Sequence, residues 1–184
     1  FTPETHMSYT KPRVNKAGGK SVGILNTNTN TQLHVSFPLM LNWGVNERVD
    51  DATGRVSYDM SLQFPRPDDM TPQMQKVLDA LISMEDKIKQ DAIANSKEWF
   101  NKAKLTSGQV DVLFNKMLYW PIDKETGERR EGASPTLRLK LDCWDGVFKS
   151  EVYDMDSQPL YPSKDESGPT PVDLITKGSQ VACL

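Results

Sequence analysis

The segment from Pro135 to Asp154 constrains the fold more than any other part of the chain, because it reads as a hairpin with one dry face. Apolar and polar residues alternate over residues 137–143, the pattern of a strand that is buried on one side. Asp145-Gly146 follows, and this dipeptide suits a two-residue type I′ turn, in which both positions need φ > 0. The sequence therefore predicts an antiparallel hairpin with Trp144 opposite Val147.

The predicted wet face of this hairpin mixes cations with aromatic rings. Parity and the two-residue turn place five residues on it: Arg138, Lys140, Trp144, Lys149 and Tyr153. Such a face can receive a flexible polyanion such as single-stranded nucleic acid, whose phosphates meet basic side chains and whose bases stack on rings. An ordinary amphipathic hairpin is the alternative, because exposed basic residues are common on any outer face.

Bulk composition limits the classes of function. The chain has 184 residues, 37% of them hydrophobic, and a net charge of −3. This charge argues against a generally basic nucleic-acid binder, so such binding needs a local patch. No apolar run approaches the ~18–20 residues that span a bilayer, which excludes a spanning helix. The lack of a signal-peptide pattern and the two widely separated cysteines favour an intracellular protein with free thiols, not a secreted one.

The first twenty residues are basic and poor in apolar side chains. Their cations are Lys11, Arg13, Lys16 and Lys20, against a single acidic residue. We expect residues 1–20 to form an extended arm that is solvated or bound to a partner, with contact to nucleic acid as the sharper alternative. The chain begins without Met and ends within a strand-like segment, so we also expect it to be a fragment.

A long hairpin is predicted over residues 33–64. Apolar residues occupy all seven odd positions from Leu33 to Val45, and even positions alternate from Val56 to Phe64 after a turn over residues 50–54. Alternation on both strands indicates one dry face, as in a sandwich or small barrel. This pattern assigns Trp43 and Tyr58 to the core.

Helical spacing begins after this hairpin. Thr71-Pro72 predicts a capped helix start, and apolar residues then recur every three or four positions, so we expect a helical insertion over about residues 72–103. Ser107 is expected to cap a short helix, and strand character returns at residues 117–122, 172–175 and 180–184. The predicted fold class is mainly β with inserted helices (α+β), an antiparallel barrel or sandwich forming a single domain over residues 21–184.

Catalytic signatures are missing from the sequence. Neither His6 nor His34 has a Cys, Asp or Glu partner at the spacing of a zinc site. Gly18-Gly19-Lys20-Ser21 looks like the end of a phosphate-binding loop, but the first glycine of that motif would fall on Val14. No nucleophile lies near a base in a known motif. We therefore expect a protein that is not an enzyme and that needs no cofactor or metal.

A family resemblance is carried by several segments in chain order: Leu41-Asn-Trp-Gly44, Tyr58-Asp-Met-Ser-Leu-Gln-Phe64, the helix over 72–103, Pro135-Thr-Leu-Arg-Leu-Lys-Leu141, 148–154 and 173–184. The chain resembles a group of proteins of nucleocytoplasmic large DNA viruses that are similar to single-stranded DNA-binding proteins of phage replisomes. The resemblance implies an OB-like barrel and non-specific, non-catalytic binding of single-stranded DNA through a basic groove with stacking rings. The five hairpin residues are then the candidates for that groove, with the four cations of residues 1–20 as a second contact.

This resemblance also implies partners and a location. Single-stranded DNA, viral replication or capsid proteins and a second copy of the chain are the expected partners, in the nucleus or a cytoplasmic virus factory of an infected cell, or in the virion. A structural virion protein that binds other capsid proteins through its arms is the alternative. Basic side chains that cluster with exposed rings would favour DNA, whereas scattered ones would favour the structural role.

Overall fold

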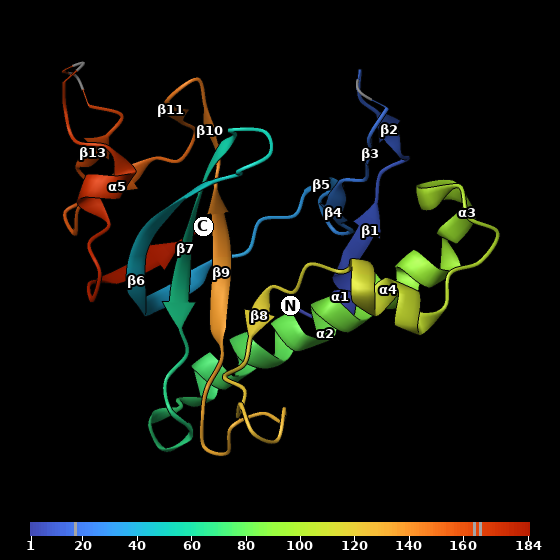
Figure 1. Cartoon of the computed structure of the whole chain (residues 1–184). Helices are drawn as coiled ribbons and strands as arrows, with labels where there is room; N and C mark the ends of the chain where they lie inside the picture. Colours follow the sequence, from blue (N-terminus) through green and yellow to red (C-terminus); the bar gives the residue numbers. More distant parts are fainter. Residues whose placement is uncertain (17, 164, 166) are drawn as a thin grey trace. The chain divides into compact units, whose positions relative to one another are not determined.

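The computed structural model describes residues 1–16, 18–163, 165 and 167–184, which form two compact units (Figure 1). The helical unit comprises Phe1–Ser36, Thr71–Met117 and Leu184, and the sheet unit comprises Phe37–Met70 and Leu118–Cys183. This division differs from the expected arm over residues 1–20 and domain over residues 21–184. Strands outnumber helices and the sheets are antiparallel, so the mainly β, α+β class is confirmed. Among the described residues no sheet closes into a barrel.

The sheet unit is built on five antiparallel strands in the order β14–β6–β7–β9–β8. Their bounds are β6 (Phe37–Val49), β7 (Val56–Gln63), β8 (Leu118–Tyr119), β9 (Thr136–Leu141) and β14 (Gln180–Cys183). Shorter elements complete the unit: η1 (Pro67–Asp69), β10 (Cys143–Trp144), β11 (Val147–Phe148), β12 (Val152–Tyr153), β13 (Pro159–Tyr161) and α5 (Pro171–Leu174).

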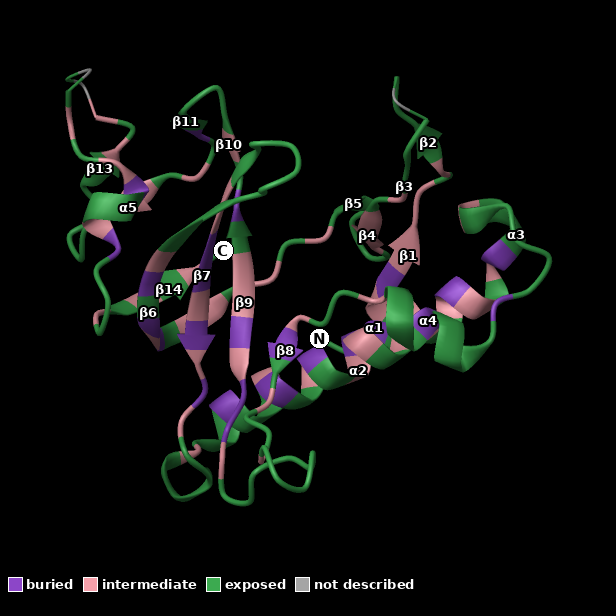
Figure 2. Cartoon of the chain, in the orientation of Figure 1, coloured by how far each residue is buried: buried purple, intermediate pink, exposed green. Residues whose placement is uncertain are grey.

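One face of this sheet is dry, and its residues meet row by row. Asn42 pairs with Leu62, Leu62 with Leu137 and Leu137 with Leu118, and each of these four side chains is at most 2% exposed. Figure 2 shows buried positions separated mostly by intermediate ones along β7 and β9, and by intermediate and exposed ones along β6. The dry even parity predicted from Val56 to Phe64 is confirmed for Met60, Leu62 and Phe64, which are buried, but Tyr58 is half-buried and Val56 is 42% exposed at the start of β7.

The expected single dry face over residues 33–45 is wrong, because a β-bulge changes the parity of β6. Asn42 pairs with Leu62 but Val45 pairs with Met60, so β6 holds one extra residue between the two pairs. Before the bulge the even residues face the core, and Trp43 is therefore 42% exposed rather than buried. Gly44 adopts φ +82° inside the bulge, a conformation that glycine tolerates best.

Gly44→Ala tests the bulge. A β-carbon at this position would lie 3.3 Å from the Cβ and from the backbone N of Lys177, in addition to the strain of positive φ. We expect the free energy of unfolding to fall by about 1–2 kcal/mol, measured by urea denaturation. Gly54→Ala is the control, because Gly54 also has positive φ but a Cβ there meets no atom within 4 Å. Equal losses in both variants would mean that the contact with Lys177 has no effect.

The predicted hairpin turn is confirmed. Asp145 and Gly146 have φ values of +51° and +79°, and Trp144 pairs with Val147. Leu137 and Leu141 are buried and Lys140 is exposed, as parity predicts. The long return strand to residue 154 is wrong, because β11 ends at Phe148 and β12 pairs with β13 instead.

The helical unit contains the predicted insertion. Its helices are α1 (Pro3–His6), α2 (Pro72–Ala94), α3 (Ser96–Phe100) and α4 (Ser107–Leu113). Thr71 caps α2, since its hydroxyl accepts a hydrogen bond from the Met74 backbone N at 3.2 Å. Thr106, one residue earlier than expected, caps α4. Buried residues recur along α2 at helical spacing: Met74, Leu78, Leu81 and Met84.

Residues 1–20 are folded rather than an extended arm, over the part of this range that the structure describes. The unit's strands are β1 (Met7–Tyr9), β2 (Arg13–Val14), β3 (Lys20–Ser21), β4 (Ile24–Asn26) and β5 (Thr31–Gln32). β1 pairs with β4, and the Tyr9 hydroxyl donates to Asp91 Oδ2 on α2 at 2.7 Å. The expected strand over residues 172–175 is also wrong: Thr170 and Asp173 form a capping box that starts the helix α5.

Candidate nucleic-acid interface

The second face of the five-stranded sheet, here called the outer face, is partly exposed and mainly polar, with apolar Leu39, Leu41 and Trp43 on β6. Its members follow from the register, because residues directly opposite each other in an antiparallel sheet point to the same side. Tyr119 pairs with Thr136 and Thr136 with Gln63, Ser61 pairs with Arg138, and Asp59 pairs with both Asn46 and Lys140. Arg48 pairs with Ser57 on the same side.

Three exposed rings project beside this sheet, and each has a cation next to it. Trp43, Tyr119 and Trp144 are 42%, 42% and 57% exposed. The Lys177 Nζ lies 5.6 Å from the ring centroid of Trp43. The Arg138 Cζ lies 6.0 Å from the ring centroid of Tyr119, and the Arg55 Cζ lies 6.0 Å from that of Trp144. These are cation–π distances. A ring beside a fixed cation offers a base a stacking surface and a phosphate a counter-charge in one place.

The position of each ring has a local cause. Trp43 is outward because it precedes the bulge, and its Nε1 donates to Gln63 Oε1 at 3.3 Å. Tyr119 faces outward on β8, next to the buried Leu118. Trp144 continues the outward parity of Arg138 and Lys140. The local backbone geometry therefore directs all three side chains to the outer side.

At the centre of the outer face, two arginines from β6 and β9 share one carboxylate on β7. Arg48 Nε lies 2.6 Å and Arg138 Nη2 2.5 Å from the same atom, Asp59 Oδ2. Asp59 is 4% exposed, and its other oxygen, Oδ1, is buried and has no hydrogen-bond partner among the described residues. Burial raises the pKa of this carboxyl, but the hydrogen bonds and charges of the two arginines outweigh burial and hold the pKa below its usual range.

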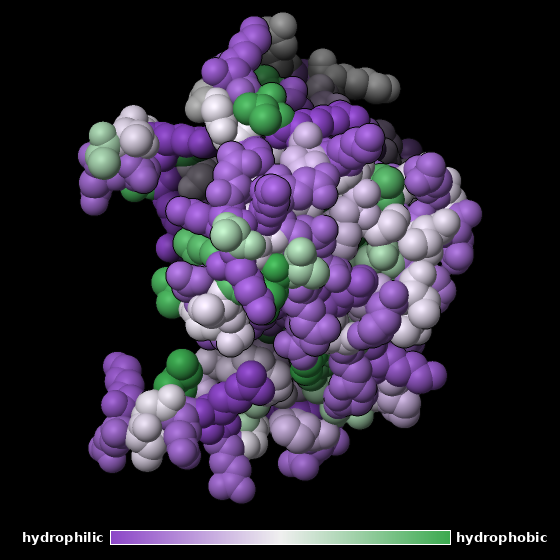
Figure 3. Space-filling view, turned by 90° about the vertical axis from the view of Figure 1, so that its right-hand side faces the viewer, coloured by the Kyte–Doolittle hydropathy of each residue, from purple (hydrophilic) through white to green (hydrophobic). Residues whose placement is uncertain are grey.

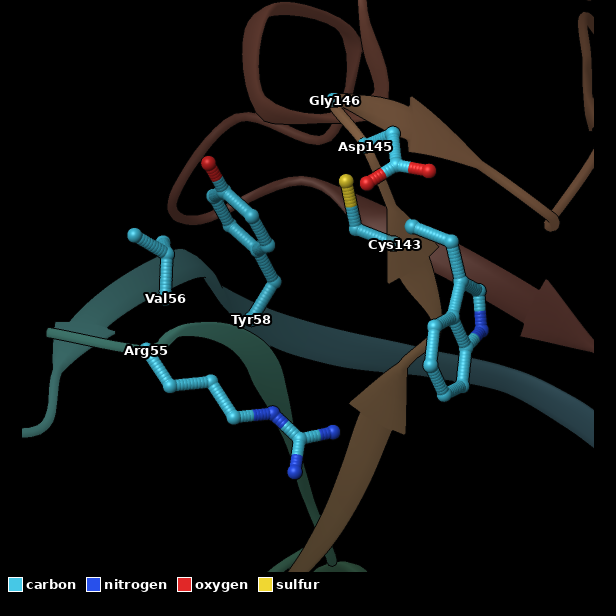
Figure 4. A pocket seen from close by; sticks show the side chains of 7 residues that line it. Arg55, Val56, Tyr58, Cys143, Asp145 and Gly146 are labelled. Atoms are coloured by element: carbon cyan, nitrogen blue, oxygen red, sulfur yellow. The ribbon is translucent and has the colours of Figure 1, made fainter. Parts of the chain in front are cut away.

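One end of the sheet opens into a pocket of about 500 Å³. The ladder between β7 and β9 ends at the pair Tyr58–Leu141, and the strands separate beyond it. Arg55, Val56 and Tyr58 line one wall, and residues 143–146 line the other (Figure 4). In Figure 4 the side chains of Tyr58 and Cys143 point to one side of the ribbons, whereas Arg55 extends to the other. Tyr58 is half-buried, and its ring packs 4.8 Å from that of Phe148.

The structure brings together part of the predicted hairpin site. Arg138, Lys140 and Trp144 lie on the outer side, and Lys149 is exposed with its backbone N bound to the carbonyl of Asp142 at 2.8 Å. Tyr153 is 53% exposed but belongs to the separate β12–β13 ribbon, where its hydroxyl donates to Glu151 at 2.7 Å. Tyr153 is therefore not part of the hairpin on which the shared face was predicted.

The second predicted set belongs to the helical unit. Lys11, Arg13, Lys16 and Lys20 are exposed around the β2–β3 hairpin, in which Arg13 pairs with Ser21. The Nζ of Lys20 donates to the carbonyl of Glu98 at 2.8 Å and to Asn101 Oδ1 at 2.7 Å, which holds its ammonium near α3. The other three cations are exposed on or beside this hairpin.

Several residues of the outer face were not predicted as site residues. They are Trp43, Arg48, Arg55, Asp59, Tyr119 and Lys177. The Trp43-Gly44 dipeptide was a usable signal, because glycine inside a strand often marks a bulge that redirects its neighbour. Arg48, Asp59 and Arg138 meet across three strands, and no local pattern shows this meeting.

The part of the chain that the structure describes contains no group of three or more His, Cys, Asp or Glu side chains able to hold a metal ion. None of its helices combines the length and the apolar character needed to cross a membrane.

Comparisons with protein-family models, with curated proteins and with solved structures give no match. We therefore infer the function from the geometry and charge of the outer face.

Proposed function

We propose that this chain is a non-catalytic protein that binds single-stranded DNA without sequence preference, on the outer face of the five-stranded sheet. The observation that carries the proposal is the occurrence of three exposed rings on one side of the sheet, each with its own cation. Stacking accepts any base because every base has a π-face, and the cations meet a backbone that is the same at every nucleotide. Binding of this kind is independent of sequence.

The proposal also includes the type of fold and the biological setting. We assign the five antiparallel strands to an OB-like core that carries residues 72–103 as an insertion. The resemblance to proteins of large DNA viruses supports a role with viral replication proteins in an infected cell. The net charge of −3 restricts binding to a local patch and disfavours a protein that coats nucleic acid over its whole surface.

A structural virion role is the second candidate, because two apolar side chains on α4 are exposed. Val112 is 86% and Leu113 64% exposed, as expected of residues that await a protein partner. The face drawn in Figure 3 is mainly hydrophilic, with hydrophobic residues singly or in small groups among those described. A broad apolar docking surface is therefore not visible on that face, which makes this candidate the weaker one.

The proposal is tested by fluorescence anisotropy with labelled oligo-dT over a salt series. We expect micromolar or tighter binding at low salt, with log K falling by about 0.7 per phosphate contacted for each unit of log salt. Lys140→Ala should reduce this slope by roughly one contact, because the exposed Lys140 ammonium pairs, among the described residues, only with the surface carboxylate of Asp142, 3.0 Å away.

Lys124→Ala is the matched control for this experiment. Lys124 is exposed in the loop between β8 and β9, so its loss removes the same charge away from the outer face. Equal effects of both variants would indicate attraction by overall charge instead of an interface on the sheet. If the chain does not bind oligo-dT even at low salt, the proposal is wrong.

A further inference from the structure

We infer that Arg48 and Arg138 form a phosphodiester clamp on the outer face and that the buried Asp59 is the positioning residue that sets the spacing of the two guanidinium groups. This inference rests on the proposed function and names the part of the interface that holds the DNA backbone. The Arg48–Asp59–Arg138 cluster spans three adjacent strands, β6, β7 and β9.

The geometry of the cluster fixes the two cations close together. Two nitrogens that lie 2.6 and 2.5 Å from one oxygen can be no more than about 5 Å apart. Without Asp59, two guanidinium groups at this separation would repel each other and turn apart. The buried Asp59 carboxylate therefore holds both guanidinium groups in a fixed position.

The cluster also retains free donors on the exposed side. A guanidinium carries five N–H groups, and Arg48 gives only its Nε–H to Asp59 among the described residues. Its side chain is 57% exposed and that of Arg138 35%, whereas that of Asp59 is 6% exposed. An anion that approaches from solvent therefore meets guanidinium groups before it meets the carboxylate. The two non-bridging oxygens of a phosphodiester can each accept from one fork.

A purely structural ion cluster is the competing explanation. Each arginine uses a single nitrogen on one shared oxygen, and Asp59 Oδ1 has no partner among the described residues. A cluster that served only to join the strands would be expected to use both carboxylate oxygens in paired, bidentate contacts. The observed geometry instead leaves N–H groups of Arg48 exposed at the surface, with no partner among the described residues.

Asp59→Asn separates positioning from simple charge. The variant has one negative charge less, so a diffuse basic patch would bind oligo-dT more tightly after the change. A clamp would lose the carboxylate that positions its two guanidinium groups. We therefore expect the affinity for oligo-dT to fall by about tenfold. Equal or tighter binding by a folded Asp59→Asn variant would overturn the clamp.

Arg48→Lys provides a second variant, in case Asp59→Asn does not fold. Arg48 is exposed enough to tolerate the change, and lysine keeps the charge but loses the planar fork. We expect a loss of about fivefold or more in affinity, against no change in Arg130→Lys, an exposed loop control. Unaltered binding by Arg48→Lys would also overturn the clamp. Failure of the unmodified chain to bind would instead refute the proposed function, so the two failures are distinguishable.

Discussion

Replacing Asn42 with leucine should lower the free energy of unfolding by about 2–4 kcal/mol, even though the site is fully buried and leucine is apolar. The Asn42 side chain accepts from the Gly44 backbone N at 2.6 Å and donates to the carbonyl and hydroxyl of Ser179 at 2.9 and 2.7 Å. Its carboxamide therefore joins the bulge of β6 to the segment that leads into β14. Leucine would leave the buried Gly44 N–H without a partner.

Urea denaturation of Asn42→Leu and Ser179→Ala measures this effect. Ser179→Ala removes the contact of the hydroxyl with Asn42 and the hydrogen bond that the hydroxyl donates to the Thr176 carbonyl at 2.8 Å, so its loss should be about 1–2 kcal/mol. A loss in Asn42→Leu beyond that of Ser179→Ala reports the buried Gly44 N–H. If Asn42→Leu is as stable as the unmodified chain, burial of the apolar side chain compensates fully, and the hydrogen bonds do not define this site.

Local patterns predicted the β9–β11 hairpin well, because each of its determinants acts over a few residues. Alternation assigned the buried faces of Leu137 and Leu141, and Asp145-Gly146 specified the turn through its two positive φ angles. The same method failed for β6. There the outward positions carry apolar Leu39 and Trp43, while the inward Asn42 is polar but satisfied by hydrogen bonds. Hydrophobicity alone therefore assigned the odd residues of β6 before the bulge to the core, although they point outward.

The candidate site was predictable only where it lies on one hairpin. Parity placed Arg138, Lys140 and Trp144 correctly on the outer side, because they belong to one continuous stretch of alternation. The approach of Arg48 to Asp59 depends on the register across the β6–β7 bulge. Contacts between side chains on different strands depend on the tertiary structure, so a local sequence pattern does not reveal them. Tyr153 was misplaced for the same reason, since its strand changes partner.

Capping chemistry explains the remaining differences. Residues 172–175 are apolar enough for a strand, but Pro171 occupies the first helical turn and Asp173 accepts from the backbone N and hydroxyl of Thr170 at 2.9 and 2.8 Å. These contacts satisfy the start of a helix. In residues 1–20 the low apolar content suggested an arm, whereas Tyr9 joins the segment to α2 by a hydrogen bond and to Trp99 on α3 by a ring contact at 4.8 Å.

Trp144→Ala should weaken the binding of oligo-dT by about 5- to 150-fold, the range that corresponds to the loss of one stacked base at roughly 1–3 kcal/mol. Trp144 has the largest exposed fraction of the three rings, and it forms one wall of the pocket opposite Arg55. Its removal deletes a stacking surface and leaves the charge of the chain unchanged. The salt slope measured by anisotropy should therefore stay constant while the affinity falls.

Tyr153→Ala is the matched control, because Tyr153 is similarly exposed at 53% but lies on the β12–β13 ribbon. We expect its affinity to equal that of the unmodified chain, and we expect Trp144→Phe to recover part of the loss because phenylalanine retains a π-face. A loss in Tyr153→Ala as large as that in Trp144→Ala would place the bases along the β12–β13 ribbon as well. Unchanged affinity in Trp144→Ala would remove the pocket end of the sheet from the interface and confine stacking to Trp43 and Tyr119.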